Sequence, residues 1–120
     1  MSLSLFLLIA GAVAAGTILA FVVFFTFKWL KSKIQNLIQT RNAKKVFVSD
    51  ITAMANGCKN KVDVDGLNNL TKQGFSKVIA AVGEDDQLVS EPEFYKDKNV
   101  DLDADVEELL GKEGMVTVEA

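Results

Sequence analysis

Residues 5–27 of the 120-residue chain read LFLLIAGAVAAGTILAFVVFFTF, and none of these 23 side chains is charged. An α-helix rises about 1.5 Å per residue, so roughly 20 apolar residues cross a hydrocarbon core about 30 Å thick. The length and composition of this run predict an N-terminal transmembrane helix over residues 1–29. This prediction decides the fold class, because it leaves only the later residues to form structure outside a bilayer.

A cleavable signal peptide is the alternative interpretation of the run. Residues 12–14 read Ala-Val-Ala, which is a small-x-small cleavage pattern. However, no Lys or Arg precedes Leu5, and cleavage after Ala14 would leave the apolar residues 17–27 at the new terminus. Signal peptides ordinarily begin with positive charge and lose their apolar core on cleavage. We therefore expect the run to be retained.

Basic and aromatic residues follow the apolar run immediately. Lys28, Lys31 and Lys33 surround Trp29. Basic residues near a span stay on the cytoplasmic side, and Trp is enriched in the headgroup layer. The pattern predicts a single-pass membrane protein with its N-terminus outside and its C-terminal region in the cytoplasm. It also assigns these four residues to the membrane interface.

Small residues recur within the run at a spacing of four. They form two neighbouring rows, Ala12, Gly16 and Ala20 in one and Gly11 and Ala15 in the other. In a helix each row would lie along one face, and such faces let membrane helices pack closely. The rows predict a helix-packing face for another membrane protein or a second copy. The alternative is that Gly and Ala are simply common in spans.

Residues 30–57 are predicted to form a basic juxtamembrane helix. Apolar residues recur there at spacings of three and four: Leu30, Ile34, Leu37, Val48, Ile51 and Ala55. This is the period of a helix, and Asn56-Gly57 is a suitable stop. A break near residues 40–43 is the alternative to a continuous helix.

The run Val46-Phe47-Val48 could instead form a strand. Phe47, Ile51 and Met54 nevertheless fall on one helical stripe, and this favours a helix.

Residues 58–120 are predicted to form a small acidic helical domain with an irregular loop over residues 84–103. From residue 62 onward five lysines face fifteen acidic residues, whereas residues 28–61 carry eight basic residues and one acid. This asymmetry favours an interaction role over a uniform surface. The acidic half is expected to suit a basic protein partner.

The main helix of this domain is expected over about residues 66–82. Its apolar stripe consists of Leu67, Leu70, Val78 and Val82. We expect this stripe to pack against Phe47, Ile51 and Met54, forming the core of the domain.

The composition excludes much catalytic and metal chemistry. The chain has no histidine and a single cysteine, Cys58. A Ser-His-Asp or Cys-His arrangement is therefore impossible within it. The Asp63-x-Asp65-Gly66 segment lacks essential calcium ligands, because Lys61 and Lys72 fall at loop positions one and twelve. We predict no catalytic residue, no metal site and no cofactor.

These observations predict an all-α protein: a transmembrane helix continuing into a juxtamembrane helix, followed by a small acidic helical cytoplasmic domain. The predicted function is a non-enzymatic membrane anchor or accessory subunit, with a cytoplasmic protein-interaction domain. The alternative is a self-assembling lysis or pore-forming factor. Expected partners are the lipid bilayer and another membrane protein or a second copy. No nucleic acid is expected, since no aromatic residues interleave with the basic ones.

Overall fold

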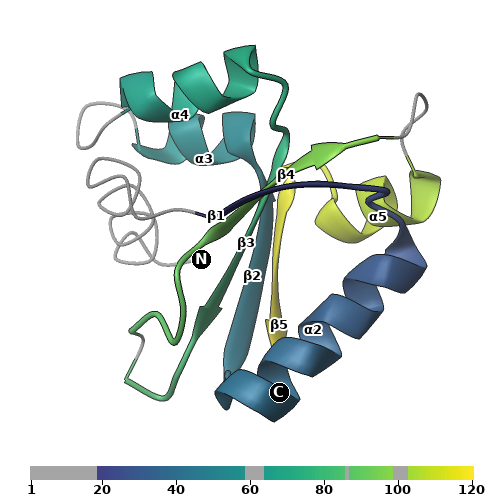
Figure 1. Cartoon of the computed structure of the whole chain (residues 1–120), viewed down its shortest axis with the longest axis vertical. Coiled ribbons are helices and arrows are strands. Elements are labelled where there is room, and N and C mark those ends of the chain that lie inside the picture. Colours follow the sequence, from purple (N-terminus) through teal and green to yellow (C-terminus); the bar gives the residue numbers. More distant parts are fainter. Residues whose placement is uncertain (1–18, 59–63, 86, 99–102) are drawn as a thin grey trace.

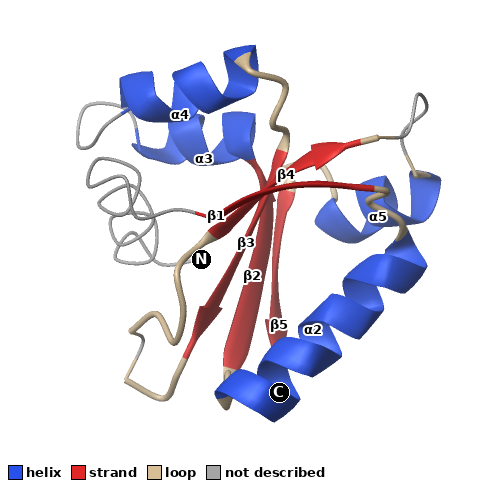
Figure 2. Cartoon of the chain, in the orientation of Figure 1, coloured by secondary structure: helices blue, strands red, loops and turns tan. Residues whose placement is uncertain are grey.

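The computed structural model describes residues 19–58, 64–85, 87–98 and 103–120. These residues form one five-stranded sheet with helices on both faces (Figures 1 and 2). In chain order the elements are β1 (Leu19–Val23), α2 (Phe27–Arg41), β2 (Lys45–Asp50), α3 (Ile51–Cys58), α4 (Val64–Lys72), β3 (Lys77–Val82), β4 (Glu93–Asp97), α5 (Ala104–Leu110) and β5 (Met115–Glu119).

The strand order across the sheet is β1-β4-β3-β2-β5. β1 runs parallel to β4, whereas the β4–β3, β3–β2 and β2–β5 pairs are antiparallel. The β2–β3 ladder extends from the Lys45–Val82 pair to the Asp50–Lys77 pair. β1 and β5 are therefore the two edges of the sheet.

β3 has the sequence KVIAAV, and all six of its residues are buried. A strand covered on both faces needs apolar residues at consecutive positions, and β3 shows this pattern. In β2, Val46 and Val48 point to one face of the sheet while Phe47 points to the other, as strand alternation requires.

Each face of the sheet has its own core. α3 and α4 cover one face and α2 and α5 the other (Figure 2). The first core consists of Phe47, Ile51, Met54, Ala55, Leu67, Leu70, Val78, Ala80, Val82 and Phe94. The second consists of Phe25, Leu30, Ile34, Leu37, Ala43, Val46, Val48, Ile79, Ala81, Tyr95, Val106 and Leu110.

α2 begins at a side-chain cap and ends in a left-handed residue. The Thr26 hydroxyl accepts a hydrogen bond of 3.2 Å from the Trp29 amide, which satisfies a free donor of the first turn. Asn42 has a φ of 54° and its N–H donates to the Leu37 carbonyl. Asn tolerates this conformation better than most residues, so the helix stops here and the chain turns into β2.

The predicted all-α fold is wrong, because five segments form a sheet. Residues 19–23, predicted as part of a transmembrane helix, form strand β1 and pair with β4. Residues 45–50, predicted as part of the juxtamembrane helix, form β2. An apolar run fits a helix and a strand equally well by periodicity, and the LAFVV sequence is rich in residues that suit strands.

The predicted membrane functions depended on a helix reaching from residue 1 to residue 29. The strand, turn and helix start at residues 19–29 overturn that helix. Across the described ranges, no helix combines the length and apolar character needed to cross a membrane. The predictions of a membrane anchor or accessory subunit, of a lysis or pore-forming factor, and of single-pass localisation with a cytoplasmic C-terminal domain are therefore wrong.

The helix expected over residues 66–82 is interrupted at Gly74. α4 ends at Lys72, and Gly74 has a φ of 99°, a conformation that L side chains rarely adopt. The Phe75 amide donates to the Leu70 carbonyl at 3.0 Å, closing the turn before β3 begins. The segment 84–103, predicted as an irregular loop, contains strand β4.

We predict that Gly74→Ala lowers the free energy of unfolding by about 2 kcal/mol, because alanine is strained at this φ. An added Cβ would also collide with the Lys96 side chain. Gly83→Ala is the control: its φ is not positive, and the Asp85 and Val89 side chains lie 3.4 Å from the added Cβ. Urea unfolding measures both variants. A Gly74→Ala change as small as that of Gly83→Ala, about 0.5 kcal/mol or less, would contradict the interpretation.

Candidate functional site

β1 presents apolar side chains to solvent at the edge of the sheet. Leu19 and Phe21 are each 39% exposed, Val22 is 51% exposed and Phe24, just beyond the strand, is 59% exposed. We call these four residues the edge patch. Leu19 and Phe21 point to one face of the sheet and Val22 to the other, so both faces of this edge expose apolar side chains, and such grouping marks interaction sites more often than isolated exposed residues do.

The backbone of β1 is paired on one side within the part of the chain that the structure describes. The Leu19 N–H donates to the Pro92 carbonyl at 3.2 Å, and the Val23 carbonyl accepts from the Lys98 N–H at 2.7 Å. Because backbone groups alternate in direction along a strand, those of Ala20 and Val22 point away from β4. They offer free donors and acceptors to an added strand.

Within the described ranges, β1 also lacks the charges, proline and bulges that usually protect an edge strand. Natural edges are blunted by charged residues, proline or bulges. β5, at the other edge, carries Glu119 and the exposed Thr117. β1 carries no charged or polar side chain at all. The two edges of the sheet therefore differ in their capacity to accept another strand.

An aromatic cluster supports the edge patch from the α2 face. The Phe21 ring stacks on Tyr95 with centroids 5.5 Å apart. Tyr95 also contacts Phe25 at 5.6 Å and Trp29 at 5.0 Å, both edge-on. Phe25 and Tyr95 are 1% and 2% exposed, so the exposed Phe21 ring rests on a buried base. This packing fixes the direction of the Phe21 side chain.

Tyr95 is in turn oriented by an ion pair. Its hydroxyl donates to Glu93 Oε2 at 2.8 Å. Lys33 Nζ lies 2.9 Å from Glu93 Oε2 and 3.0 Å from Oε1. Burial, then the hydrogen bond to Glu93 and its negative charge, raise the pKa of Tyr95 well above its ordinary value. Tyr95 therefore remains a neutral donor at physiological pH.

The far end of the patch is fixed to the C-terminal end of β4. The Phe25 amide donates to Asp97 Oδ1 at 3.1 Å. Lys98 Nζ lies 5.5 Å from the centroid of the Phe24 ring, in the range of a cation–π contact. Residues 24–26 are thus attached to β4 at the point where the chain leaves β1 and enters α2.

The residues predicted from sequence lie in several environments. Of the proposed helix-packing face, Ala20 lies in β1 in register with Phe94. The other members, Gly11, Ala12, Ala15 and Gly16, lie outside the described residues.

The four residues predicted for the membrane interface all lie in α2. Trp29 belongs to the aromatic cluster and Lys33 to the ion pair with Glu93. Lys31 Nζ lies 5.6 Å from the centroid of the Phe27 ring, and Lys28 is exposed. The structure therefore brings only Trp29 and Lys33 to the candidate site.

Sequence reasoning missed Phe21, Tyr95 and Glu93 as site residues. β4 is short, and its only apolar residues, Phe94 and Tyr95, are adjacent and both buried, so the sequence shows no alternation that would indicate a strand there. The contacts that join them to α2 cross 60 residues of sequence in the case of Lys33 and Glu93. No local pattern encodes a contact of that separation.

A second charged cluster lies where β2 and β3 meet α5, on the face of the sheet that α2 and α5 cover. Lys77, 6% exposed, places its Nζ 2.6 Å from Asp50 Oδ1 and 3.4 Å from Glu107 Oε1. These contacts join β3 to the end of β2 and to α5. A buried lysine with two carboxylate partners is compensated in charge, and removing a partner is costly. We assign this cluster to stability.

Comparison with protein-family models, with curated proteins and with solved structures finds no match to this chain. What the site can bind is therefore inferred from the side chains and backbone groups of the site itself. Rigid aromatic and aliphatic contacts beside free backbone groups are suited to recognition of an extended polypeptide.

We predict that Tyr95→Phe lowers the free energy of unfolding by about 1 kcal/mol, because Glu93 loses a hydrogen-bond donor while the ring contacts remain. Tyr95→Leu should cost about 3 kcal/mol, because it also removes the base under Phe21. Trp29 is the only tryptophan and reports on the cluster directly. Its emission should shift to longer wavelength in Tyr95→Leu and stay unchanged in Tyr95→Phe; equal shifts would contradict the assigned packing.

Proposed function

We propose that this chain is a non-catalytic protein-interaction module whose edge strand β1 pairs with β1 of a second copy. The observation that carries the proposal is the uncharged, half-exposed strand whose outward backbone groups pair with no other described strand. Antiparallel pairing would join two five-stranded sheets into one continuous sheet across a twofold axis.

The β1 sequence is complementary to itself in this arrangement. With Phe21 on the twofold axis, Ala20 of one copy lies opposite Val22 of the other. These are the two residues whose backbone groups point outward, so they form hydrogen-bonded pairs. Phe21 then lies opposite its symmetry mate, which covers the exposed part of the ring. No like charges meet along the strand, since LAFVV carries none.

Charges at the two ends of β1 favour the same antiparallel direction. Lys98 lies at the Val23 end, since its N–H bonds the Val23 carbonyl. Glu91 lies at the Leu19 end, directly before Pro92, whose carbonyl binds the Leu19 N–H. Both charged residues are exposed. A twofold axis brings the basic end of one copy toward the acidic end of the other, which aids selection of the partner.

The buried charged groups of the described residues are all paired with other side chains, which favours a non-catalytic role. Lys77 is paired with Asp50 and Glu107, and Glu93 is paired with Lys33 and Tyr95. The Lys77 pairs join β3 to β2 and α5, and the Lys33–Glu93 pair joins α2 to β4, whereas Glu93 and Tyr95 both lie in β4. Their partners account for their burial without a role in chemistry.

The test is sedimentation of the 120-residue chain and its edge-strand variants. We predict that the chain dimerises and that Val22→Lys weakens the dimer at least about tenfold, which corresponds to ~1.4 kcal/mol, because a charge enters the paired edge. Val22 is half-exposed, so folding should be retained. Thr117→Lys places the same charge on the exposed face of the other edge strand and should leave the dimer unchanged.

A charge pair tests the register. Ala20→Glu alone should weaken the dimer as Val22→Lys does. Both substitutions in one chain place opposite charges across the twofold axis and should restore at least half of the lost free energy. A monomeric chain, or a dimer insensitive to Val22→Lys, would refute the proposal; strand addition by a different protein would then be the remaining use of this edge.

A further inference from the structure

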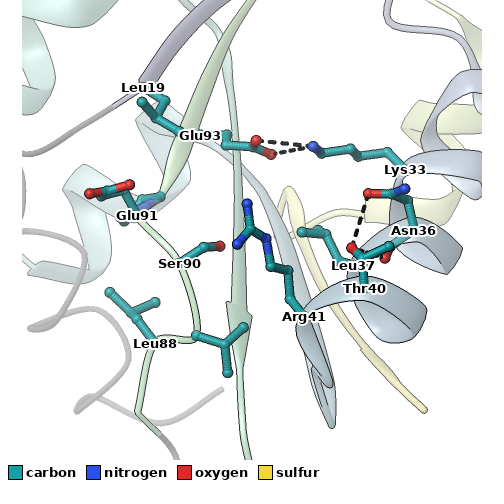
Figure 3. A pocket seen from close by; sticks show the side chains of 12 residues that line it. Leu19, Lys33, Asn36, Leu37, Thr40, Arg41, Leu88, Ser90, Glu91 and Glu93 are labelled. Atoms are coloured by element: carbon teal, nitrogen blue, oxygen red, sulfur yellow. Dashed lines mark hydrogen bonds and ion pairs between the residues drawn. The ribbon is translucent and has the colours of Figure 1, made fainter.

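A polar cleft of about 800 Å³ lies on the α2 side of the sheet, away from the outer edge of β1. One wall is the second half of α2, and the other is the segment from Leu88 to Glu93 that leads into β4 (Figure 3). Its volume falls within the range of small-molecule sites. The strand-pairing proposal uses the outer side of β1, and it shares with this cleft only Leu19 and Glu91, which lie at one end of the strand.

The ion pair of Lys33 and Glu93 closes one end of the cleft. Because Lys33 binds both Glu93 oxygens and Tyr95 binds one of them, these charges are already compensated. The Thr40 hydroxyl bonds the Asn36 carbonyl at 2.7 Å, so it is turned back onto its own helix. Lys33, Glu93 and Thr40 therefore line the cleft with polar groups that already have partners, so a ligand would be bound by other residues.

Arg41 is the charged group that the cleft leaves available. It lies in the last turn of α2, and its guanidinium makes no hydrogen bond or ion pair with any residue in the described part of the chain. Figure 3 shows it extending into the cleft toward the Ser90 hydroxyl, while the Glu91 carboxylate points away. A cation in the last turn would ordinarily complement the helix dipole, but this guanidinium does not bond the terminal carbonyls.

We propose that the cleft binds a small organic monocarboxylate, with Arg41 as the anion-binding residue. The planar guanidinium fork matches a carboxylate bidentately. Ser90 supplies a further donor beside it. Leu19, Leu37 and Leu88 line the cleft and would contact a short apolar body.

The surroundings favour a single negative charge over a doubly charged phosphate. The C-terminal end of α2 carries a partial negative charge, and the Lys33 ammonium that faces the cleft is already paired with Glu93. One guanidinium is enough to balance a monoanion. A dianion would face the negative end of the helix with no second unpaired cation among the described residues that line the cleft.

The experiment titrates hexanoate into the 120-residue chain and follows the amide resonances of Arg41 and Ser90. We expect saturable shifts with a dissociation constant of roughly 1 mM, which one charge-assisted contact and a short chain support. Hexanol, which lacks the charge, should bind at least about tenfold more weakly, a difference of ~1.4 kcal/mol.

Variants assign the anion-binding role. Arg41→Gln should abolish saturable hexanoate binding, and Arg41→Lys should retain part of it, since it keeps the charge without the fork. Lys28→Gln removes one exposed charge from the other end of α2 and should leave binding unchanged. Val22→Lys should also bind hexanoate normally, which separates this result from the fate of strand pairing.

Three outcomes of the hexanoate, variant and phosphate titrations would overturn the proposal, and the hexanol comparison adds a fourth. They are an absence of saturable shifts, equal binding of hexanoate by Arg41→Gln and the unaltered chain, and tighter binding of inorganic phosphate than of hexanoate. Equal affinity for hexanol would likewise show that the carboxylate is not recognised.

Discussion

The burial of β3 on both faces is the constraint on which the rest of the structure depends. A strand enclosed in this way must be apolar at every position that has no charge partner, and β3 meets this with Val78 to Val82. Ala80 and Ala81 are small, so a helix layer can approach each face closely. Its one charged residue, Lys77, is compensated by Asp50 and Glu107. β2 and β4 pair with the two edges of β3. α3 and α4 then pack on one face of the sheet, and α2 and α5 pack on the other.

The apolar stripes in the sequence predict correctly which residues share a core, but they predict less well whether those residues lie in helices or in strands. Phe47, Ile51 and Met54 were assigned to one helical face, and they do share one core, although Phe47 lies in a strand. The stripe Leu67, Leu70, Val78 and Val82 packs in that same core, although it is divided between α4 and β3. Burial on a common side constrains a sequence whichever element carries it. An apolar pattern therefore indicates which residues are buried on the same face of the sheet, even where it does not distinguish a helix from a strand.

The candidate site was harder to predict because its contacts are long-range. The apolar run that contains β1 is long enough to resemble a membrane span, and its strand character depends on β4, which begins at Glu93. Likewise, Trp29 was recognised as an aromatic residue at an interface, but its partner Tyr95 is far along the chain. In the sequence, Arg41 is one of several basic residues with nothing to distinguish it. Its place in a cleft depends on the segment from Leu88 to Glu93, which forms the opposite wall. Tertiary pairing supplies this information, and local propensity does not.

The parallel pairing of β1 with β4 also sets an order of assembly during synthesis. Leu19 pairs with Glu93, so about seventy residues must be made after β1 before its partner exists. At roughly 5–20 residues per second, this interval lasts several seconds. β2 and β3 are closer in sequence and antiparallel, and closing a shorter loop costs less entropy. β1 therefore leaves the ribosome before the other described strands, and its apolar side chains remain without their β4 partner throughout this interval.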